Sequence, residues 1–186
     1  MVGVPADYAF RTVWRVAGTV AEVRDVLEDG LALPRWWPAV YLAVEPVRGD
    51  GLALFTTGWL PYTLRWTLRL TEPVSDTGFA LTATGDLTGT GRWTFTPDGP
   101  EVEITYDWRV SADKALLRRL TWLLRPLFTA NHHWAMARGE ESLRLELRRR
   151  RATTDEQRRR IPPPPPPTFR RSAGTRRGAP AAGPPA

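Results

Sequence analysis

The stretch YTLRWTLRL, residues 62–70, decides the fold class of this chain of 186 residues. Its apolar residues occupy every second position (Tyr62, Leu64, Trp66, Leu68 and Leu70), and threonine or arginine stands between them. Side chains of a β-strand point alternately to the two faces of a sheet, so this spacing predicts a strand with one buried face and one face in water. The stretch VEITYDWRV, residues 102–110, has the same alternation. Strands of this kind are typical of an antiparallel sheet.

Turn residues divide the chain around these two stretches into seven expected strands. The strands cover residues 7–17, 40–48, 52–59, 62–72, 79–86, 89–96 and 102–112. Two short helices are expected after the first strand. One covers residues 20–29, where Thr19 and Glu22 have the spacing of a capping box. The other is a brief turn within LPRWWPAVY at 33–41, where two prolines limit its length.

The pattern becomes helical after Asp113, which is suited to cap a helix. Apolar and small residues then recur at a spacing of about 3.6, which predicts one helix from residue 114 to about residue 150. Pro126 is expected to kink or split this helix. Its last turns, with Arg144 and residues 148–151, are expected to project into solvent.

This order of elements predicts an α+β fold. A sheet with one wet face must bury its other face, and the long helix is the element able to cover it. A strongly curved sheet around one helix encloses space between the two. The predicted architecture is therefore a helix-grip fold: a curved seven-stranded antiparallel sheet wrapped around a long C-terminal helix, with two short helices after the first strand.

The formal net charge of +6 belongs to the end of the chain. Residues 1–150 carry 18 Lys and Arg against 18 Asp and Glu, whereas residues 151–186 carry 8 Arg against 2 acids. We therefore expect one domain at residues 1–150 and a disordered Arg/Pro-rich tail at 151–186, with prolines 162–167 in polyproline II. The first interpretation of the Arg clusters is a solvated low-complexity tail. The alternatives are attraction of the tail to an anionic membrane or nucleic acid, and binding of its proline run to an SH3-type groove.

Composition excludes several classes of site. The chain has no Cys and only two His, so neither a metal site nor a cofactor is expected. No Ser-His-acid grouping is apparent, which argues against covalent acyl chemistry. The sequence has no apolar run of membrane-spanning length and no secretory signal at its start. We expect a cytoplasmic protein that is a monomer or a weak dimer.

Five strings resemble the START-like SRPBCC superfamily and, within it, bacterial polyketide cyclase/dehydrase-like proteins. They are LPRWWPAVY at 33–41, GWLPYTLRW at 58–66, GDLTGTGRW at 85–93, VEITYDWRV at 102–110 and NHHW at 131–134. The resemblance spans about residues 7–148. It implies a hydrophobic cavity between sheet and helix that holds lipids, sterols, polyketides or other small apolar molecules. Members of the family include binders, transporters and cyclases, and the Arg/Pro tail is not part of the family pattern.

A cavity wall is expected from aromatic residues, because Trp and Tyr combine a large apolar surface with one polar group. The alternative is that these residues only fill the core.

Asn131 is expected either to tie the helix to the sheet or to bind a ligand, and His132 is suited to acid–base chemistry at neutral pH. The predicted catalytic residues are His132 and Asn131. The predicted ligand-binding residues are Trp36, Trp37, Tyr62, Trp66, Trp93, Phe95, Tyr106, Trp108, Phe128 and Asn131.

These features leave three hypotheses for function. The first is binding of a small hydrophobic ligand, lipid or polyketide-like, in an internal cavity. The second is a polyketide cyclase, aromatase or dehydratase that relies on cavity shape and a few polar groups. The third is a protein recruited by its tail to an anionic membrane or nucleic acid, with the domain as a scaffold.

Overall fold

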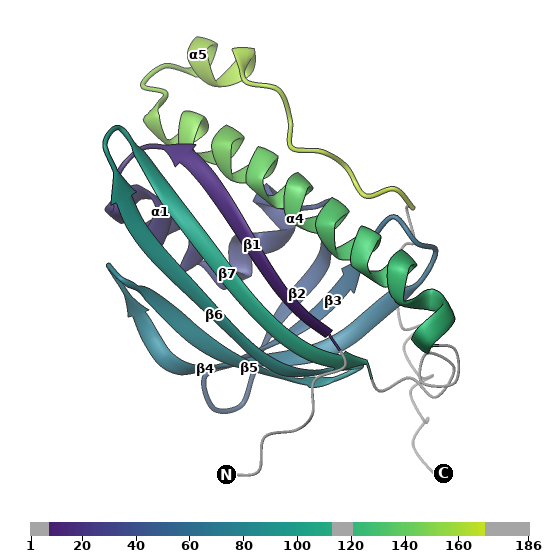
Figure 1. The fold of residues 1–186 in the computed structure, drawn as a ribbon. Coiled ribbons are helices and arrows are strands. Elements are labelled where there is room, and N and C mark those ends of the chain that lie inside the picture. Colours follow the sequence, from purple (N-terminus) through teal and green to yellow (C-terminus); the bar gives the residue numbers. More distant parts are fainter. Residues whose placement is uncertain (1–7, 113–120, 170–186) are drawn as a thin grey trace, which may run out of the picture.

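Seven strands form one curved antiparallel sheet in the computed structural model, which describes residues 8–112 and 121–169. The order across the sheet is β1-β7-β6-β5-β4-β3-β2, so β2 to β7 pair in chain order, β1 pairs with β7, and β1 and β2 form the two edges. Figure 1 shows the sheet curling around one long helix. The strands are β1 (Tyr8–Ala17), β2 (Tyr41–Val47), β3 (Gly51–Thr57), β4 (Thr63–Ser75), β5 (Gly78–Gly85), β6 (Leu87–Asp98) and β7 (Glu101–Ala112).

Short helices connect β1 to β2 at one end of the sheet: α1 (Val20–Leu27), the 3-10 turn η1 (Gly30–Ala32) and α2 (Leu33–Trp36). The predicted capping box is present at the start of α1. Thr19 Oγ1 accepts a hydrogen bond from the Glu22 N–H at 3.3 Å, and the Glu22 carboxylate accepts one from the Thr19 N–H at 2.8 Å. These bonds satisfy backbone donors at the helix start that have no partner within the helix.

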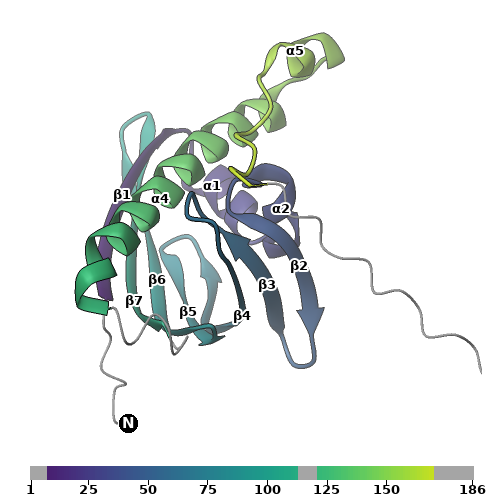
Figure 2. The ribbon, with the colours of Figure 1, turned by 90° about the vertical axis from the view of Figure 1, so that its right-hand side faces the viewer.

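The long helix α4 (Thr121–Arg151) crosses the concave face of the sheet, which confirms the predicted helix-grip architecture (Figures 1 and 2). The helix is continuous through Pro126, so the expected split at this residue is wrong. Pro126 lies within the first two described turns of α4. Because proline has no N–H group, it removes only one of the many backbone hydrogen bonds of this long helix. The predicted cap Asp113 lies outside the described residues.

A cluster of indoles forms the centre of the core. Trp14, on β1, is 1% exposed, and its ring lies 5.5 Å from that of Trp37 and 5.2 Å from that of Trp93. The sequence reasoning did not assign Trp14 to the core. It has the same parity as the buried Tyr8 and Val16, whereas Val13, counted among the strand-forming residues, is 46% exposed. The alternation of buried and exposed residues along β1 therefore assigns Trp14 to the buried face.

The C-terminal end of α4 is fixed to β1 and α1, which corrects the expectation that its arginines project into solvent. The Arg151 guanidinium pairs with Glu22 at 2.6 Å and donates to the carbonyl oxygen of Ala17 at 2.8 Å. Arg144 donates to the carbonyl oxygen of Arg15 at 2.9 Å. β1 is an edge strand that pairs only with β7, and arginine supplies donors to carbonyl groups on its other side.

Glu146 is the buried acceptor of this end of the helix. Its side chain is 3% exposed and accepts two hydrogen bonds of 2.9 Å from Arg35, on α2, and one of 3.0 Å from Arg150. Burial raises the pKa of Glu146, but the hydrogen bonds from the two guanidinium groups outweigh burial, so the pKa lies below its usual value. The carboxylate is therefore charged at neutral pH and holds α2 against α4.

Ordered structure continues past the expected domain boundary at residue 150. A second capping box, of Thr154 and Gln157, begins the short helix α5 (Asp155–Arg160). The chain then turns back along α4 (Figure 1), and the Arg149 guanidinium donates to the carbonyl oxygen of Pro162. The expectation of a disordered tail is thus corrected for residues 151–169, and residues 170–186 lie outside the described part of the chain.

The Glu146 carboxylate provides a test of this packing. Glu146→Gln is expected to lower the free energy of unfolding by about 2 kcal/mol at neutral pH, because two guanidinium groups lose a charged acceptor at a buried position. The matched control is Glu141→Gln, since Glu141 pairs with Arg138 on the exposed face of the same helix; its expected change is below about 0.5 kcal/mol. Urea unfolding measures both. Equal effects of the two substitutions would contradict the assigned role.

Candidate ligand-binding cavity

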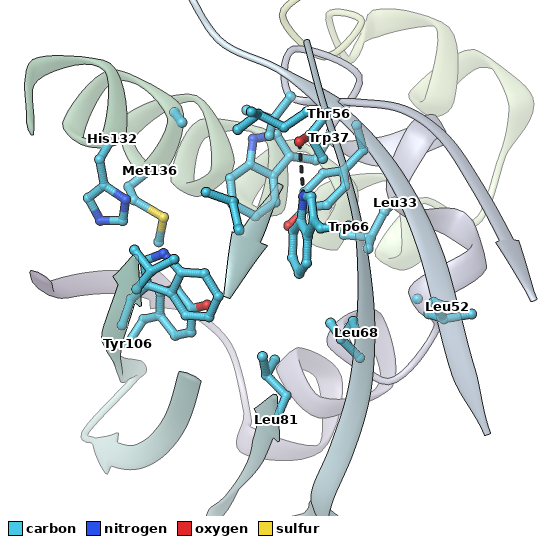
Figure 3. A pocket seen from close by; sticks show the side chains of 18 of the residues that line it. Leu33, Trp37, Leu52, Thr56, Trp66, Leu68, Leu81, Tyr106, His132 and Met136 are labelled. Carbon is cyan, nitrogen blue, oxygen red and sulfur yellow. Dashed lines mark hydrogen bonds between the residues drawn. The ribbon is translucent and has the colours of Figure 1, made fainter. Parts of the chain in front are cut away.

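A cavity of about 290 Å³ lies between the concave face of the sheet and α4. Figure 3 shows its wall, with Trp66, Leu68 and Leu81 contributed by the sheet and His132 and Met136 by the helix. Most of the wall is apolar, and aromatic rings supply much of it. Enclosed, mainly apolar cavities with a few polar groups are the usual form of small-molecule sites.

Nine residues predicted at ligand-binding or catalytic positions line this cavity: Trp37, Tyr62, Trp66, Trp93, Tyr106, Trp108, Phe128, Asn131 and His132. Trp36 and Phe95 do not line it and are buried in the core, at 0% and 4% exposure. Phe95 has the correct strand parity, but it lies toward the end of β6 that α1 contacts. Contact of the nine residues with a ligand remains a prediction.

Strand pairing arranges the aromatic rings of the wall into a stacked row. Trp93 and Tyr106 are register partners on β6 and β7, and their rings stack with centroids 4.1 Å apart. The Tyr106 ring in turn stacks on Trp108 at 5.7 Å. Gly91 makes room for this row, because a Cβ atom there would lie 2.8 Å from the Tyr106 hydroxyl oxygen. The row presents flat, weakly polar surface to the cavity.

Asn131 connects α4 to the segment between β3 and β4. Its Oδ1 atom accepts hydrogen bonds from the backbone N–H groups of Trp59 at 3.0 Å and Leu60 at 3.4 Å, and its Nδ2 atom donates to the Tyr62 hydroxyl at 3.4 Å. Gly58 permits this approach, since a Cβ atom there would collide with Asn131 Oδ1. The amide oxygen is thus engaged by the protein's own backbone.

His132 lies in the cavity wall against β1. Its ring stacks on Phe10 with centroids 4.0 Å apart, and its Nε2 atom lies 3.4 Å from Thr12 Oγ1. Burial lowers the pKa of His132 to about 4, and His133 lowers it further in the same direction. The imidazole is therefore neutral at physiological pH, which makes it a poor general acid there.

Three tyrosine hydroxyls of the wall stay protonated at neutral pH. Burial raises the pKa of Tyr62 to about 12 and also raises those of Tyr41 and Tyr106. The sequence reasoning missed Tyr41, the last residue of the LPRWWPAVY string and the first of β2. Tyr41 stands close in sequence to Trp37, which was predicted to bind ligand, and this position could have identified it as a residue of the wall. In the structure the two rings lie 5.1 Å apart.

The part of the chain that the structure describes contains no cluster of three or more His, Cys, Asp or Glu side chains placed to hold a metal ion. Within the same residues, no helix is long and apolar enough to cross a membrane.

Comparison with known families gives one match that spans most of the chain. The model of the family described as "Polyketide cyclase / dehydrase and lipid transport" matches residues 9–148. The matched range contains every residue of the cavity wall except Tyr8. Among curated proteins, no relative matches the sequence.

Solved structures share the fold at low sequence identity. The Zhui aromatase/cyclase from Streptomyces sp. R1128 is 15% identical, with a TM-score of 0.63 over 78% of this chain and 96% of that one. A protein from Thermus thermophilus is 15% identical, with a TM-score of 0.59 over 73% and 97% of the two chains. A START superfamily protein from Mycobacterium smegmatis is 15% identical, with a TM-score of 0.54 over 69% and 93%. At this identity the comparisons concern the fold alone.

Asn131 can be tested as a tie between helix and sheet. Asn131→Ala is expected to lower the free energy of unfolding by about 1–3 kcal/mol, because two backbone donors lose their acceptor. Asn131→Asp keeps an acceptor oxygen and is expected to retain more of the stability. His133→Ala is the control on the exposed face, and thermal unfolding compares the three. The tie would be refuted if Asn131→Ala proved as stable as His133→Ala.

Burial of His132 predicts a dependence of stability on pH. The unfolded chain takes up a proton near the ordinary pKa of 6.5, whereas the folded protein does so only at about 4. The free energy of unfolding therefore falls as the pH decreases from 6.5 toward 4, and His132→Phe is expected to remove this part of the loss. The variant His133→Gln is expected to keep most of this pH-dependent loss of stability, because burial lowers the pKa of His132 more than His133 does. Urea unfolding across this pH range measures the difference, and identical pH profiles for wild type and His132→Phe would contradict it.

Proposed function

The chain belongs to the polyketide cyclase/dehydrase and lipid transport family, and on that premise we propose that it is a non-catalytic binder or carrier of a small hydrophobic molecule. The molecule occupies the cavity between the sheet and α4. The observation that carries this proposal is the cavity itself: about 290 Å³ of space lined mostly by apolar and aromatic side chains. This volume is near the lower end of the range for small-molecule sites.

The chemistry of the polar groups favours binding over catalysis. Cyclisation or dehydration of a polyketide-like chain needs groups that move protons at neutral pH. Burial lowers the pKa of His132 to about 4, which makes its imidazole a weak base and leaves it without a proton to give at neutral pH. The Asn131 oxygen is engaged by Trp59 and Leu60. Turnover of a poly-β-keto substrate that is lost in His132→Ala would support the cyclase instead.

The arginines at the end of α4 give little support to recruitment by charge. Arg150 and Arg151 form ion pairs with Glu146 and Glu22, so part of the positive charge is neutralised within the fold. This favours a structural role for these arginines over a role in binding anionic surfaces.

A cavity-filling substitution tests the proposed function. Ala135→Phe places a ring in the cavity from α4, and the variant is expected to lose the small molecule that wild-type protein carries through gentle purification. Ala137→Phe is the matched control, because Ala137 is exposed on the same helix. Native mass spectrometry detects the bound molecule, and circular dichroism checks that both variants fold. Equal occupancy of Ala135→Phe and wild type would argue against the cavity as the site.

A further inference from the structure

We infer that the ligand of this cavity is an uncharged, ring-bearing molecule whose hydrogen-bond-accepting oxygen binds the hydroxyl groups of Tyr41 and Tyr106. The inference rests on the proposed function and adds to it the charge and the polar group of the ligand.

The charge of the ligand follows from the charges of the wall. Among the described residues that line the cavity, none is Arg or Lys, and the only acidic side chains are those of Glu28 and Asp50. An anionic group brought into this space would lose its hydration without meeting a cation, which costs several kcal/mol. The wall therefore disfavours fatty acids, sulfonates and phosphates.

Two cations lie near Asp50 but do not line the cavity. Arg69 donates to the carbonyl oxygens of Arg48 and Gly49, in the turn that precedes β3, and Arg48 is exposed in the same turn. They supply no positive charge to the interior, since neither contributes to the wall.

The accepting oxygen follows from hydroxyl groups that have no partner. Tyr106 is 9% exposed and Tyr41 lines the same cavity, and neither hydroxyl forms a hydrogen bond within the described structure. The Tyr41 ring lies 5.1 Å from that of Trp37, and the Tyr106 ring lies 4.1 Å from that of Trp93, so both tyrosines belong to the aromatic part of the wall. A hydroxyl group that lines an apolar cavity and has no partner in the protein is suited to donate a hydrogen bond to an oxygen of a bound molecule.

The other polar groups of the wall already have partners. Thr56 Oγ1 accepts from the Trp66 indole N–H at 3.1 Å (Figure 3). The Asn131 amide is bonded to the backbone and to Tyr62. Among the described residues, the hydroxyl groups of Tyr41 and Tyr106 thus differ from those of Thr56 and Tyr62 in having no hydrogen bond to another residue, and Tyr106 belongs to the aromatic row of β6 and β7. A carbonyl group attached to a ring system would match both features at once.

A pair of dyes with one ring skeleton tests the charge. N-phenylnaphthylamine is uncharged, and anilinonaphthalene sulfonate adds a sulfonate to the same rings. Dye fluorescence with the full-length protein is expected to show binding of the neutral dye and an affinity for the sulfonate that is weaker by about a hundredfold or more. Equal affinity for the two dyes would overturn the inference and leave the proposed function standing. Failure of the neutral dye to bind would count against the proposed function itself.

A second pair tests the accepting oxygen. Benzophenone and diphenylmethane share two rings, and only benzophenone has a carbonyl group; each is titrated against the bound neutral dye. The double variant Tyr41→Phe, Tyr106→Phe is expected to lower the preference for benzophenone over diphenylmethane by about fivefold, the value of one hydrogen bond between neutral groups.

The matched control is Tyr62→Phe, which removes a hydroxyl from another part of the wall and is expected to leave the preference unchanged. Unchanged affinity for the neutral dye shows that each variant keeps its cavity. An equal preference in wild type and in the double variant would overturn the assignment to Tyr41 and Tyr106, and so would a loss of the same size in Tyr62→Phe.

Discussion

The concave face of the sheet is wider than the one helix that covers it. Seven strands at about 4.8 Å spacing extend across roughly 30 Å, whereas a helix with its side chains is only about 10–12 Å wide. Curling of the sheet brings β1 and β7 to the helix on one side (Figure 2), and α1 and α2 close one end. The space that remains is the cavity. Its existence follows from this mismatch in width, and its size depends on how firmly α4 is held.

Two polar contacts hold α4 at a fixed height above the sheet. Near its C-terminal end, the Glu146 carboxylate joins α4 to Arg35 and Arg150. Closer to its start, the Asn131 amide joins it to the segment before β4. Glu146 is a buried acceptor that needs donors, and Asn131 supplies an acceptor to two backbone N–H groups, so loss of either contact would leave polar groups without partners. The aromatic row of β6 and β7 lies beneath the helix. The described wall contains no cation, and this is the basis of the inferred preference of the cavity for uncharged molecules.

Much of the fold was predictable from local patterns, because burial of one sheet face leaves a period of two in the sequence. Alternation in residues 62–70 and 102–110 located β4 and β7, and the capping box at Thr19 located α1. Most of the predicted aromatic wall follows from the same parity. Alternation along a strand identifies the face of the sheet to which a side chain points, but not whether the residue lies level with the cavity. Phe95 was therefore predicted in the cavity wall, although it lies in the core. The arginines of α4 were misplaced because their partners lie more than a hundred residues away.

The sequence alone determined the order of elements, the family resemblance and the apolar character of the interior, since each of these is written in residue type and spacing. Only the tertiary structure decided which polar groups are free. Asn131, Thr56, Tyr41 and Tyr106 all carry polar side chains. Within residues 8–112 and 121–169, however, the first two form hydrogen bonds and the hydroxyl groups of the last two do not. Hydrogen bonding depends on distances between atoms from distant segments, and those distances exist only after the sheet has closed around the helix.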